Sequence, residues 1–420
     1  MEATHLGLSD GDLRQIVVQN ASDQGRPAGE LGRIVRTSLQ PFNPSPEGFL
    51  AAHYALAITL ETPSGRKEEC TFFVKCLPTE NAALARYLEE IGSFRKESHV
   101  LQDIVAAIQR VCPWRTIAPR VLWAHGDRVL VMNNLKIAGY STVKRESGLL
   151  DEPFLRQALE TLACLHAGSI VLEERNARTL SELFPDVLRE NAWNSNPQST
   201  RHQDVTNVIE LYSELVRLCD HWPESRKAAI LQQLPALMRR IYAFVVPSTE
   251  FRNTLNHGDL WCNNVMFRCD AKGLPIGCAL VDYQLSRYVP PAYDVNLLLY
   301  LTTDRKTRET SRPALLDHYY EVFVGVLDCN GLYASVILPQ DSFRRSAEVY
   351  RLAGLIHATM ISGEVTLPDV FLQQVFGNLE LTGSFMPIQK VRVCVKAFEA
   401  DECYRNRLIE LMEELFAHIQ

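Results

Sequence analysis

The feature that most constrains the fold is a change in hydrophobic pattern near residue 135. Before it, five segments have the apolar, β-branched pattern of strands, at 34–39, 54–60, 70–77, 120–124 and 128–132. One helical segment at 81–111 interrupts them, and a short helix capped by Ser9 precedes them. After residue 139, apolar residues recur mainly with helical spacing. The sequence therefore predicts an α+β fold with a small strand-rich N-terminal lobe, residues 1–135, and a larger, mainly helical C-terminal lobe, residues 136–420. A ligand cleft is expected between them.

Bulk composition narrows the function classes. The 420 residues are 46% hydrophobic and 22% charged, which is enough apolar material for a packed core. A formal net charge of −7 argues against general binding of nucleic acid or anionic membranes. The eleven cysteines form no CxxC pair, so we expect free thiols rather than a zinc site or a disulfide framework. The N-terminus has no signal-peptide pattern and no apolar run reaches membrane-spanning length, so we expect a soluble, cytoplasmic protein.

The stretch 256–264, NHGDLWCNN, carries the strongest candidate chemistry. Asp259 can accept or orient the proton of an attacking hydroxyl group, and Asn264 can reach a magnesium ion. Asp282 follows the apolar segment 278–281 and can hold the same metal, because Mg²⁺ prefers oxygen ligands. A hairpin over 265–281 would return both ends to one place. This set suits phosphoryl transfer, which depends on positioning and charge neutralisation.

Each of these residues also has a simpler explanation. Taken singly, polar residues in such a stretch are more often ordinary loop formers, and His257 more plausibly braces the loop than takes part in the chemistry. Lys75 alone would be an edge-strand lysine, and Glu97 alone would lie on a solvated helix face. Asp294 would be the N-cap of the next helix. Only their joint occurrence favours a catalytic site.

The same motif carries a family resemblance. The segment 257–264 resembles the catalytic loop of the aminoglycoside phosphotransferase and choline kinase superfamily, whose members have a protein-kinase-like two-lobed fold. Together with Met266-Phe267 and the VDYQ sequence at 281–284, it is most similar to the ecdysteroid kinase-like (choline-kinase-like) proteins of insects. The segment 162–169 resembles a helix of that family. The similarity extends from about Gly29 to beyond Gly363.

The resemblance implies roles for residues of the N-terminal lobe. Lys75 would contact the α- and β-phosphates of ATP, and Glu97 would pair with this lysine. Gly48 lies in a segment similar to the phosphate-binding loop, although Ala51 stands where glycine is usual. Met132 and Leu135 would bind the nucleotide in the connection between the lobes, where this chain has Asn133-Asn134 in place of a common acidic pair.

In the C-terminal lobe, the resemblance implies that Asp259, Asn264 and His257 form the catalytic loop and that Asn264 and Asp282 hold Mg²⁺. In the superfamily an aspartate at the position of Asp294 supports that loop.

We therefore expect an ATP- and Mg²⁺-dependent kinase that phosphorylates a hydroxyl of an ecdysteroid, another lipophilic alcohol or a xenobiotic. Its partners would be ATP and the small hydroxylated substrate, without nucleic acid or membrane, and the sequence leaves the oligomeric state open. Two alternatives remain: a choline or ethanolamine kinase, and a family member that binds ligands without turnover. A protein kinase is disfavoured because the His-Arg-Asp and Ala-Pro-Glu signatures are missing.

Overall fold

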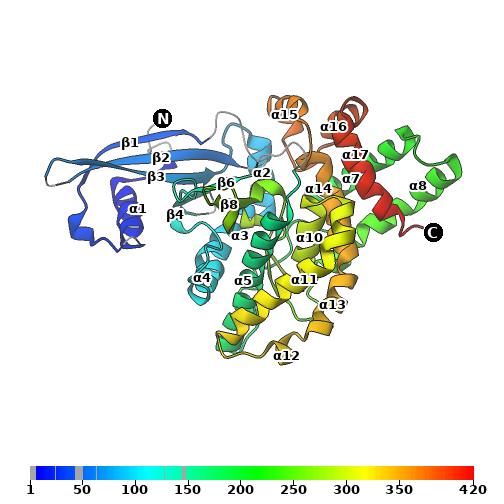
Figure 1. The fold of residues 1–420 in the computed structure, drawn as a ribbon. Coiled ribbons are helices and arrows are strands. Elements are labelled where there is room, and N and C mark those ends of the chain that lie inside the picture. Colours follow the sequence, from blue (N-terminus) through cyan, green and yellow to red (C-terminus); the bar gives the residue numbers. More distant parts are fainter. Residues whose placement is uncertain (1–5, 24, 43–50, 63, 127, 144–147) are drawn as a thin grey trace.

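The N-terminal part of the chain is built on one five-stranded antiparallel sheet (Figure 1). The computed structural model describes residues 6–420 except residues 24, 43–50, 63, 127 and 144–147. The strands are β1 (Arg33–Pro41), β2 (Ala52–Glu61), β3 (Lys67–Cys76), β4 (Val121–His125) and β5 (Val129–Asn133), in the order β1-β2-β3-β5-β4. All four neighbouring pairs are antiparallel. The five strands predicted from the sequence are confirmed.

The two faces of this sheet bury different things, because successive side chains of a strand point to opposite faces. One face packs against α1 (Asp10–Asp23), which Figure 1 shows lying along the sheet. Its buried apolar side chains include Leu13 and Ile16 of α1, Phe72 and Val74 of β3, and Val131 of β5. The alternate residues of β3, among them Lys75, therefore point to the opposite face, toward the remainder of the chain.

The helical segment expected at 81–111 is interrupted. The structure has α2 (Ala82–Ile91), α3 (Ser93–His99), a π-helical segment (Val100–Val105) and α4 (Ala106–Val111). Gly92 is the reason for the first break, because it ends α2 with a left-handed backbone, φ 62°. A single continuous helix was thus a wrong expectation, although nearly all of the segment is helical.

The C-terminal part is mainly helical, and Figure 1 shows its helices packed beside the sheet. The longest are α5 (Glu152–Asn176) and α11 (Arg305–Asp328), which lie side by side. The others are α6 (Leu180–Leu183), α7 (Thr200–Leu218), α8 (Glu224–Arg239), α9 (Ile241–Phe244), α10 (Ala292–Thr302), α12 (Ala334–Ile337), α13 (Gln340–Val349), α14 (Arg351–Val365), α15 (Asp369–Phe376), α16 (Ile388–Ala400) and α17 (Glu402–Phe416). Helix α10 is buried along its whole length, so it forms the centre of this part.

Short strands connect the two parts at the candidate loop. β8 (Val265–Cys269) and β9 (Pro275–Leu280) form the expected hairpin, and β6 (Tyr140–Thr142) joins it in a three-stranded sheet. β7 (Thr254–Asn256) pairs with β10 (Arg287–Val289) on either side of that hairpin. The hairpin register places the two ends of the motif together, since the backbone N–H of Val281 donates to the carbonyl of Asn264 at 3.0 Å.

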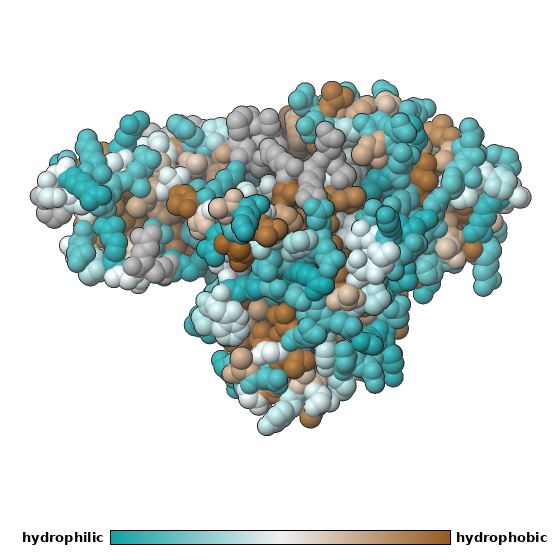
Figure 2. Space-filling model, viewed as in Figure 1, coloured by the Kyte–Doolittle hydropathy of each residue, from teal (hydrophilic) through white to brown (hydrophobic). Residues whose placement is uncertain are grey.

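The surface and core fit this architecture. On the face seen in Figure 2, polar residues predominate and apolar residues gather in separate small groups. Among the helices that the structure describes, none combines the length and apolar character needed to cross a lipid bilayer. The chain thus has the kinase-like arrangement of a strand-rich N-terminal sheet and a larger helical C-terminal part.

Candidate active site

Lys75 of β3 is the centre of a buried charge cluster. Its Nζ lies 2.7 Å from Glu97 Oε2 of α3 and 2.7 Å from Asp282 Oδ1. The Lys75 and Glu97 side chains are almost completely buried, whereas the Asp282 side chain keeps 26% of its exposure. A buried lysine needs such anionic partners to offset the loss of hydration. One ammonium group therefore links the sheet, helix α3 and the turn after the β8–β9 hairpin.

Asp282 has an unusual backbone. Its φ and ψ are both 70°, a left-handed conformation that non-glycine residues seldom adopt. This conformation ends β9 and begins the short 3₁₀ turn Tyr283–Leu285. The side-chain amide of Gln284 donates to the second carboxylate oxygen at 3.3 Å. Backbone strain of this kind is often found at functional sites, where the surrounding structure maintains it.

Asp259 and Asn264 face each other across one turn of the loop. The Asn264 amide nitrogen donates to both the backbone carbonyl and the Oδ2 of Asp259, each at 2.9 Å. The intervening 3₁₀ turn, Cys262–Asn264, brings the two side chains together. Since the amide nitrogen is turned to Asp259, the amide oxygen of Asn264 is free of hydrogen bonds to any residue in the described part of the chain.

The loop before Asp259 is held by Asp294. One carboxylate oxygen accepts the backbone N–H of His257 at 2.5 Å and the other accepts that of Gly258 at 3.0 Å. Asp294 lies within the first turn of α10, and the N-cap residue is Pro291. The expectation that Asp294 caps this helix was therefore wrong. Its carboxylate is used by the loop instead, as in the alternative implied by the family resemblance.

His257 braces the same loop through its ring. The Asp259 backbone N–H donates to His257 Nδ1 at 3.2 Å, so the proton of the neutral ring is on Nε2, which donates to the Val281 carbonyl at 2.9 Å. Burial lowers the pKa of His257, which favours this neutral form. His257 thus connects Val281, the residue before Asp282, to the loop that carries Asp259.

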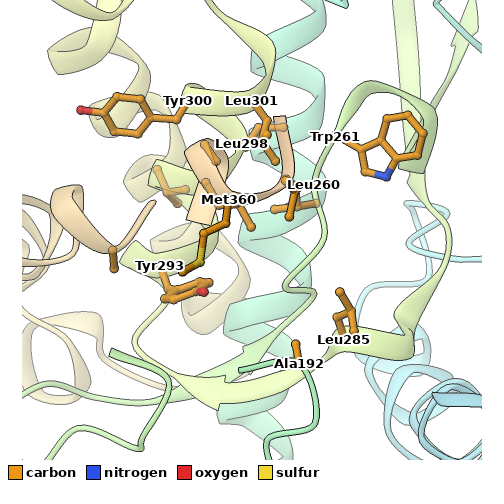
Figure 3. Packing of buried hydrophobic residues seen from close by; sticks show 14 of the residues in the cluster. Ala192, Leu260, Trp261, Leu285, Tyr293, Leu298, Tyr300, Leu301 and Met360 are labelled. Atoms are coloured by element: carbon orange, nitrogen blue, oxygen red, sulfur yellow. The ribbon is translucent and has the colours of Figure 1, made fainter. Parts of the chain in front are cut away.

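Gly258 is required for steric reasons. Its φ is +79°, and a Cβ atom there would lie 2.4 Å from the carbonyl oxygen of Leu285. Figure 3 shows the next apolar residue, Leu260, pointing into the buried cluster near Met360 and Leu298, while Trp261 lies on the other side of the loop. The loop is therefore anchored to the helical core and clamped against the turn after Asp282.

A further layer of buried polar groups supports Asp294. His166 of α5 places Nε2 3.3 Å from Asp294 Oδ2, and its Nδ1 lies 2.8 Å from the Tyr319 hydroxyl of α11. All three side chains are fully buried. The segment 162–169, singled out by resemblance, thus contributes to the site through its histidine.

The buried surroundings raise the pKa of Asp259, Glu97 and Lys75, but for different reasons. Burial, and then the nearby Asp282 charge, raise the pKa of Asp259 to about 8. Burial opposes the positive charge of Lys75, but Asp282 and Glu97 outweigh it and raise the lysine pKa. Burial also raises the pKa of Glu97, against the opposing effect of Lys75. Asp259 is therefore poised to exchange a proton near neutral pH, while Lys75 stays charged.

These groups line a single cleft between the sheet and the helical part. Lys75, Glu97, Asp259, Asn264 and Asp282 all line it. Met132 and Leu135 also line it, as expected for the connection between the lobes, whereas His257 is buried behind it. Gly48, expected in the phosphate-binding loop, lies outside the described residues.

The cleft has walls that sequence reasoning did not find. They come from segments far from the motif, and include Phe42, Phe73, Ala192, Trp193, Arg201, Ile361, Glu364, Val365 and Phe385. Phe73 neighbours Lys75 in β3 and Phe42 follows β1, whereas Ala192, Trp193 and Phe385 lie in connecting segments and the others lie on helices. Their residue types alone do not distinguish a cleft wall from packed core or ordinary surface.

A kinase-like two-lobed fold, with a buried lysine–glutamate pair facing two aspartates and an asparagine, is that of a small-molecule phosphotransferase. The family model of the ecdysteroid kinase-like family matches residues 45–331. The chain belongs to this family.

Solved structures and curated proteins were also compared with the chain. A mutant aminoglycoside 2'-phosphotransferase-IIIa in complex with GDP is 12% identical, with 97% of this chain and 98% of that chain covered and a TM-score of 0.39. A microcompartment-associated aminopropanol kinase is 12% identical, with 94% and 99% covered and a TM-score of 0.36. The comparison with curated proteins gave no match.

Proposed function

We propose that the protein is an ATP- and Mg²⁺-dependent kinase that phosphorylates a hydroxyl group of an ecdysteroid or another lipophilic alcohol. The observation that carries the proposal is the convergence of Lys75, Asp282, Asn264 and Asp259 on one cleft. Phosphoryl transfer needs a cation for the phosphates, oxygen ligands for a metal and a carboxylate for the attacking hydroxyl. Lys75 provides the cation, Asn264 and Asp282 provide the metal ligands, and Asp259 provides the carboxylate.

In this proposal the sheet binds ATP, so residues 1–135 form the nucleotide-binding lobe and residues 136–420 the catalytic and substrate-binding lobe. The adenine ring would lie in the apolar slot between Met132 of β5 and Met266 of β8, beside Leu135. Lys75 would donate to the α- and β-phosphates, and Glu97 would keep the lysine in place. The family resemblance supports this assignment.

The residues present fit a magnesium ion of the kind that is held jointly by protein and phosphates. Asn264 and Asp282 both line the cleft and supply oxygen atoms, and the Asn264 amide oxygen accepts no hydrogen bond from the residues that the structure describes. No group of three or more His, Cys, Asp or Glu residues suited to a metal occurs in the described ranges. Two protein ligands are nevertheless typical for Mg²⁺, which takes its other ligands from water and phosphates. When bound, Mg²⁺ would neutralise charge on the phosphates.

Asp259 would act on the alcohol. Its carboxylate would accept the hydroxyl proton while the alcohol oxygen forms a bond to the γ-phosphorus of ATP and the bond from that phosphorus to the β–γ bridging oxygen breaks, which releases ADP. The raised pKa of about 8 suits a group that must take up a proton during the reaction. Asn264 would keep the carboxylate in position by donating to its Oδ2.

The acceptor would bind against the apolar walls of the cleft. Trp193, Ile361, Val365 and Phe385 supply these walls, and all come from the helical part. A lipophilic alcohol would bury its carbon skeleton there at a gain of about 25 cal/mol per Å² of apolar surface. The name of the family supports an ecdysteroid as one such acceptor.

The proposal is tested by ADP release with ATP, Mg²⁺ and a panel of alcohols that contains hydroxysteroids, long-chain alcohols, choline and ethanolamine. We expect ADP release with a lipophilic alcohol, dependence on Mg²⁺, and its loss in Asp259→Asn. Ligand binding without ADP release for every alcohol would favour the non-catalytic alternative. ADP release with choline or ethanolamine alone would favour the other alternative.

A further inference from the structure

Arg201 is a buried cation in the wall of the cleft. It lies in the first turn of α7, is only 3% exposed, and lines the same cleft as Asp259. Its Nε and Nη2 atoms are buried and have no hydrogen-bond partner in the part of the chain that the structure describes. A buried guanidinium normally uses its donors, because each buried donor without a partner costs about 1–3 kcal/mol.

The neighbours of Arg201 hold it in place without satisfying it. Its guanidinium carbon lies 5.1 Å from the Tyr87 ring centre and 5.8 Å from that of Phe385. Such contacts stabilise the charge but leave the N–H groups in the guanidinium plane free. Phe385 also lines the cleft, so the aromatic support continues into the apolar wall.

The buried carboxylates of this region are already engaged by other donors. Asp204 accepts the Tyr87 hydroxyl at 2.9 Å through one oxygen, and the Ser384 hydroxyl and the Met386 N–H through the other. Glu364 is paired with Lys390 at 2.6 Å. Neither Asp204 nor Glu364 forms an ion pair with Arg201, so the Nε and Nη2 donors of Arg201 have no carboxylate partner among the described residues.

We propose that Arg201 is a specificity-determining residue that donates hydrogen bonds to a carbonyl or carboxylate oxygen of the acceptor. The acceptor is then a lipophilic compound with two polar ends: a hydroxyl at Asp259 and an acceptor oxygen at Arg201, with apolar skeleton between them. This inference rests on the proposed function, because it assigns the substrate class of the same cleft. It also disfavours choline and ethanolamine, since a buried guanidinium repels an ammonium group.

Arginine suits this role because its planar donors match the oxygen atoms of carbonyl and carboxylate groups. A hydrogen bond to a charged donor contributes about 1.5–3 kcal/mol, which corresponds to a roughly 10- to 100-fold change in the dissociation constant. An acceptor that lacks this oxygen would leave the guanidinium donors without partners and would bind more weakly by about that factor.

The test measures direct binding of three 3-hydroxysteroids that share one skeleton and have a methylene group, a ketone or a carboxylate at carbon 17. We expect wild-type protein to bind the ketone or the carboxylate at least tenfold more tightly than the methylene compound. Arg201→Met should remove this difference while binding of the methylene compound changes less than threefold. Arg201→Lys should retain part of the preference for the carboxylate, because it keeps the charge but not the planar donors.

The matched control is Arg217→Met on the same helix, since Arg217 is half-exposed and pairs with Glu214 at the surface. It should leave all three affinities unchanged, and thermal unfolding of each variant would show whether the fold is kept. Equal wild-type affinity for the three steroids, or a preference that survives in folded Arg201→Met, would overturn the inference. Because the readout is binding, a steroid preference that depends on Arg201 would stand even if no phosphorylation occurred, which would instead reject the proposed function.

Discussion

At the scale of single residues, the two carboxylates of the cleft have different environments. Asp259 is almost completely buried and accepts a hydrogen bond from Asn264, whereas Asp282 is partly exposed and contacts Lys75. Asp259 therefore changes protonation near neutral pH, whereas Asp282 forms an ion pair with Lys75. Different environments are how enzymes give neighbouring carboxylates different roles.

Asp259 gives the first prediction, on pH dependence. The base must be ionised to accept a proton, so kcat/KM should rise with pH and level off above about 8, the pKa of the free protein. Asp259→Asn should lower kcat by roughly 10²- to 10⁴-fold. A kcat/KM profile that is flat between about pH 6 and pH 9 would contradict the role of Asp259 as the base.

The same residue gives a prediction on stability. Because the folded pKa of Asp259 is raised above its unfolded value, its ionisation destabilises the fold as pH rises through about 8. Asp259→Asn removes this ionisable group and can still accept the bond from Asn264. Its melting temperature should therefore equal or exceed that of wild type at alkaline pH, measured by thermal unfolding at several pH values. If Asp259→Asn were less stable than wild type, and the difference grew with pH, this explanation would be contradicted.

Lys75→Met is expected to destabilise the fold, in contrast to Asp259→Asn. It leaves Glu97 and Asp282 without their shared cation, which should cost about 3 kcal/mol of unfolding free energy. Burial already raises the pKa of Glu97, so protonation of this carboxyl favours the folded state. The loss should accordingly be smaller at about pH 5 than at about pH 8 in denaturant unfolding. A loss that does not depend on pH would contradict the ion-pair explanation.

At the scale of elements, the loop before Asp259 is fixed by its contact with the turn after Asp282. Gly258→Ala would force a Cβ against the Leu285 carbonyl in a backbone conformation already unfavourable for alanine. We expect loss of activity and a clearly lowered melting temperature. Gly273→Ala is the matched control, because Gly273 has the same φ of +79° but open space around it. If both variants lost the same stability, backbone conformation rather than this contact would explain the effect.

Sequence patterns predicted elements better than they predicted the site. The five strands of the main sheet and the β8–β9 hairpin follow from local alternation, which survives in the fold because each strand buries one face. The break at Gly92 was not predicted, although its cause is local: the glycine ends α2 with a left-handed backbone. For Asp294 the residues alone predicted a helix N-cap, and its support of the loop was expected only from the family resemblance, because the contact joins segments that are distant in the chain. An aspartate near the start of a helix can cap that helix or support a neighbouring loop, and the sequence around Asp294 does not distinguish these two roles.

The motif residues were found because they lie close together in the sequence, and Lys75 and Glu97 because they resemble a family pattern. Arg201 could not be found in either way. It belongs to no motif, and its sequence position in the first turn of α7 is ordinary. What distinguishes it is burial without hydrogen-bond partners, which only the assembled fold shows.

At the scale of the whole molecule, the cleft is formed by both parts of the chain. Lys75 comes from the sheet and Asp282 from the turn after β9 in the C-terminal part, so a ligand that contacts both should stabilise the whole fold. ATP with Mg²⁺ at one hundred times its dissociation constant would add about 2.7 kcal/mol. The melting temperature of wild type should therefore rise with ATP and Mg²⁺, and that of Asp282→Asn should rise much less. An equal rise in both proteins would place nucleotide binding elsewhere.

The central claim is that this cleft transfers a phosphoryl group from ATP to an alcohol with Asp259 as the proton acceptor. The most direct measurement is mass spectrometry of a hydroxysteroid after incubation with ATP, Mg²⁺ and either wild-type protein or Asp259→Asn. We expect a phosphate monoester of the steroid with wild type and almost none with the variant, while the variant still binds ATP. Formation of the same ester at equal rates by both proteins would contradict the claim.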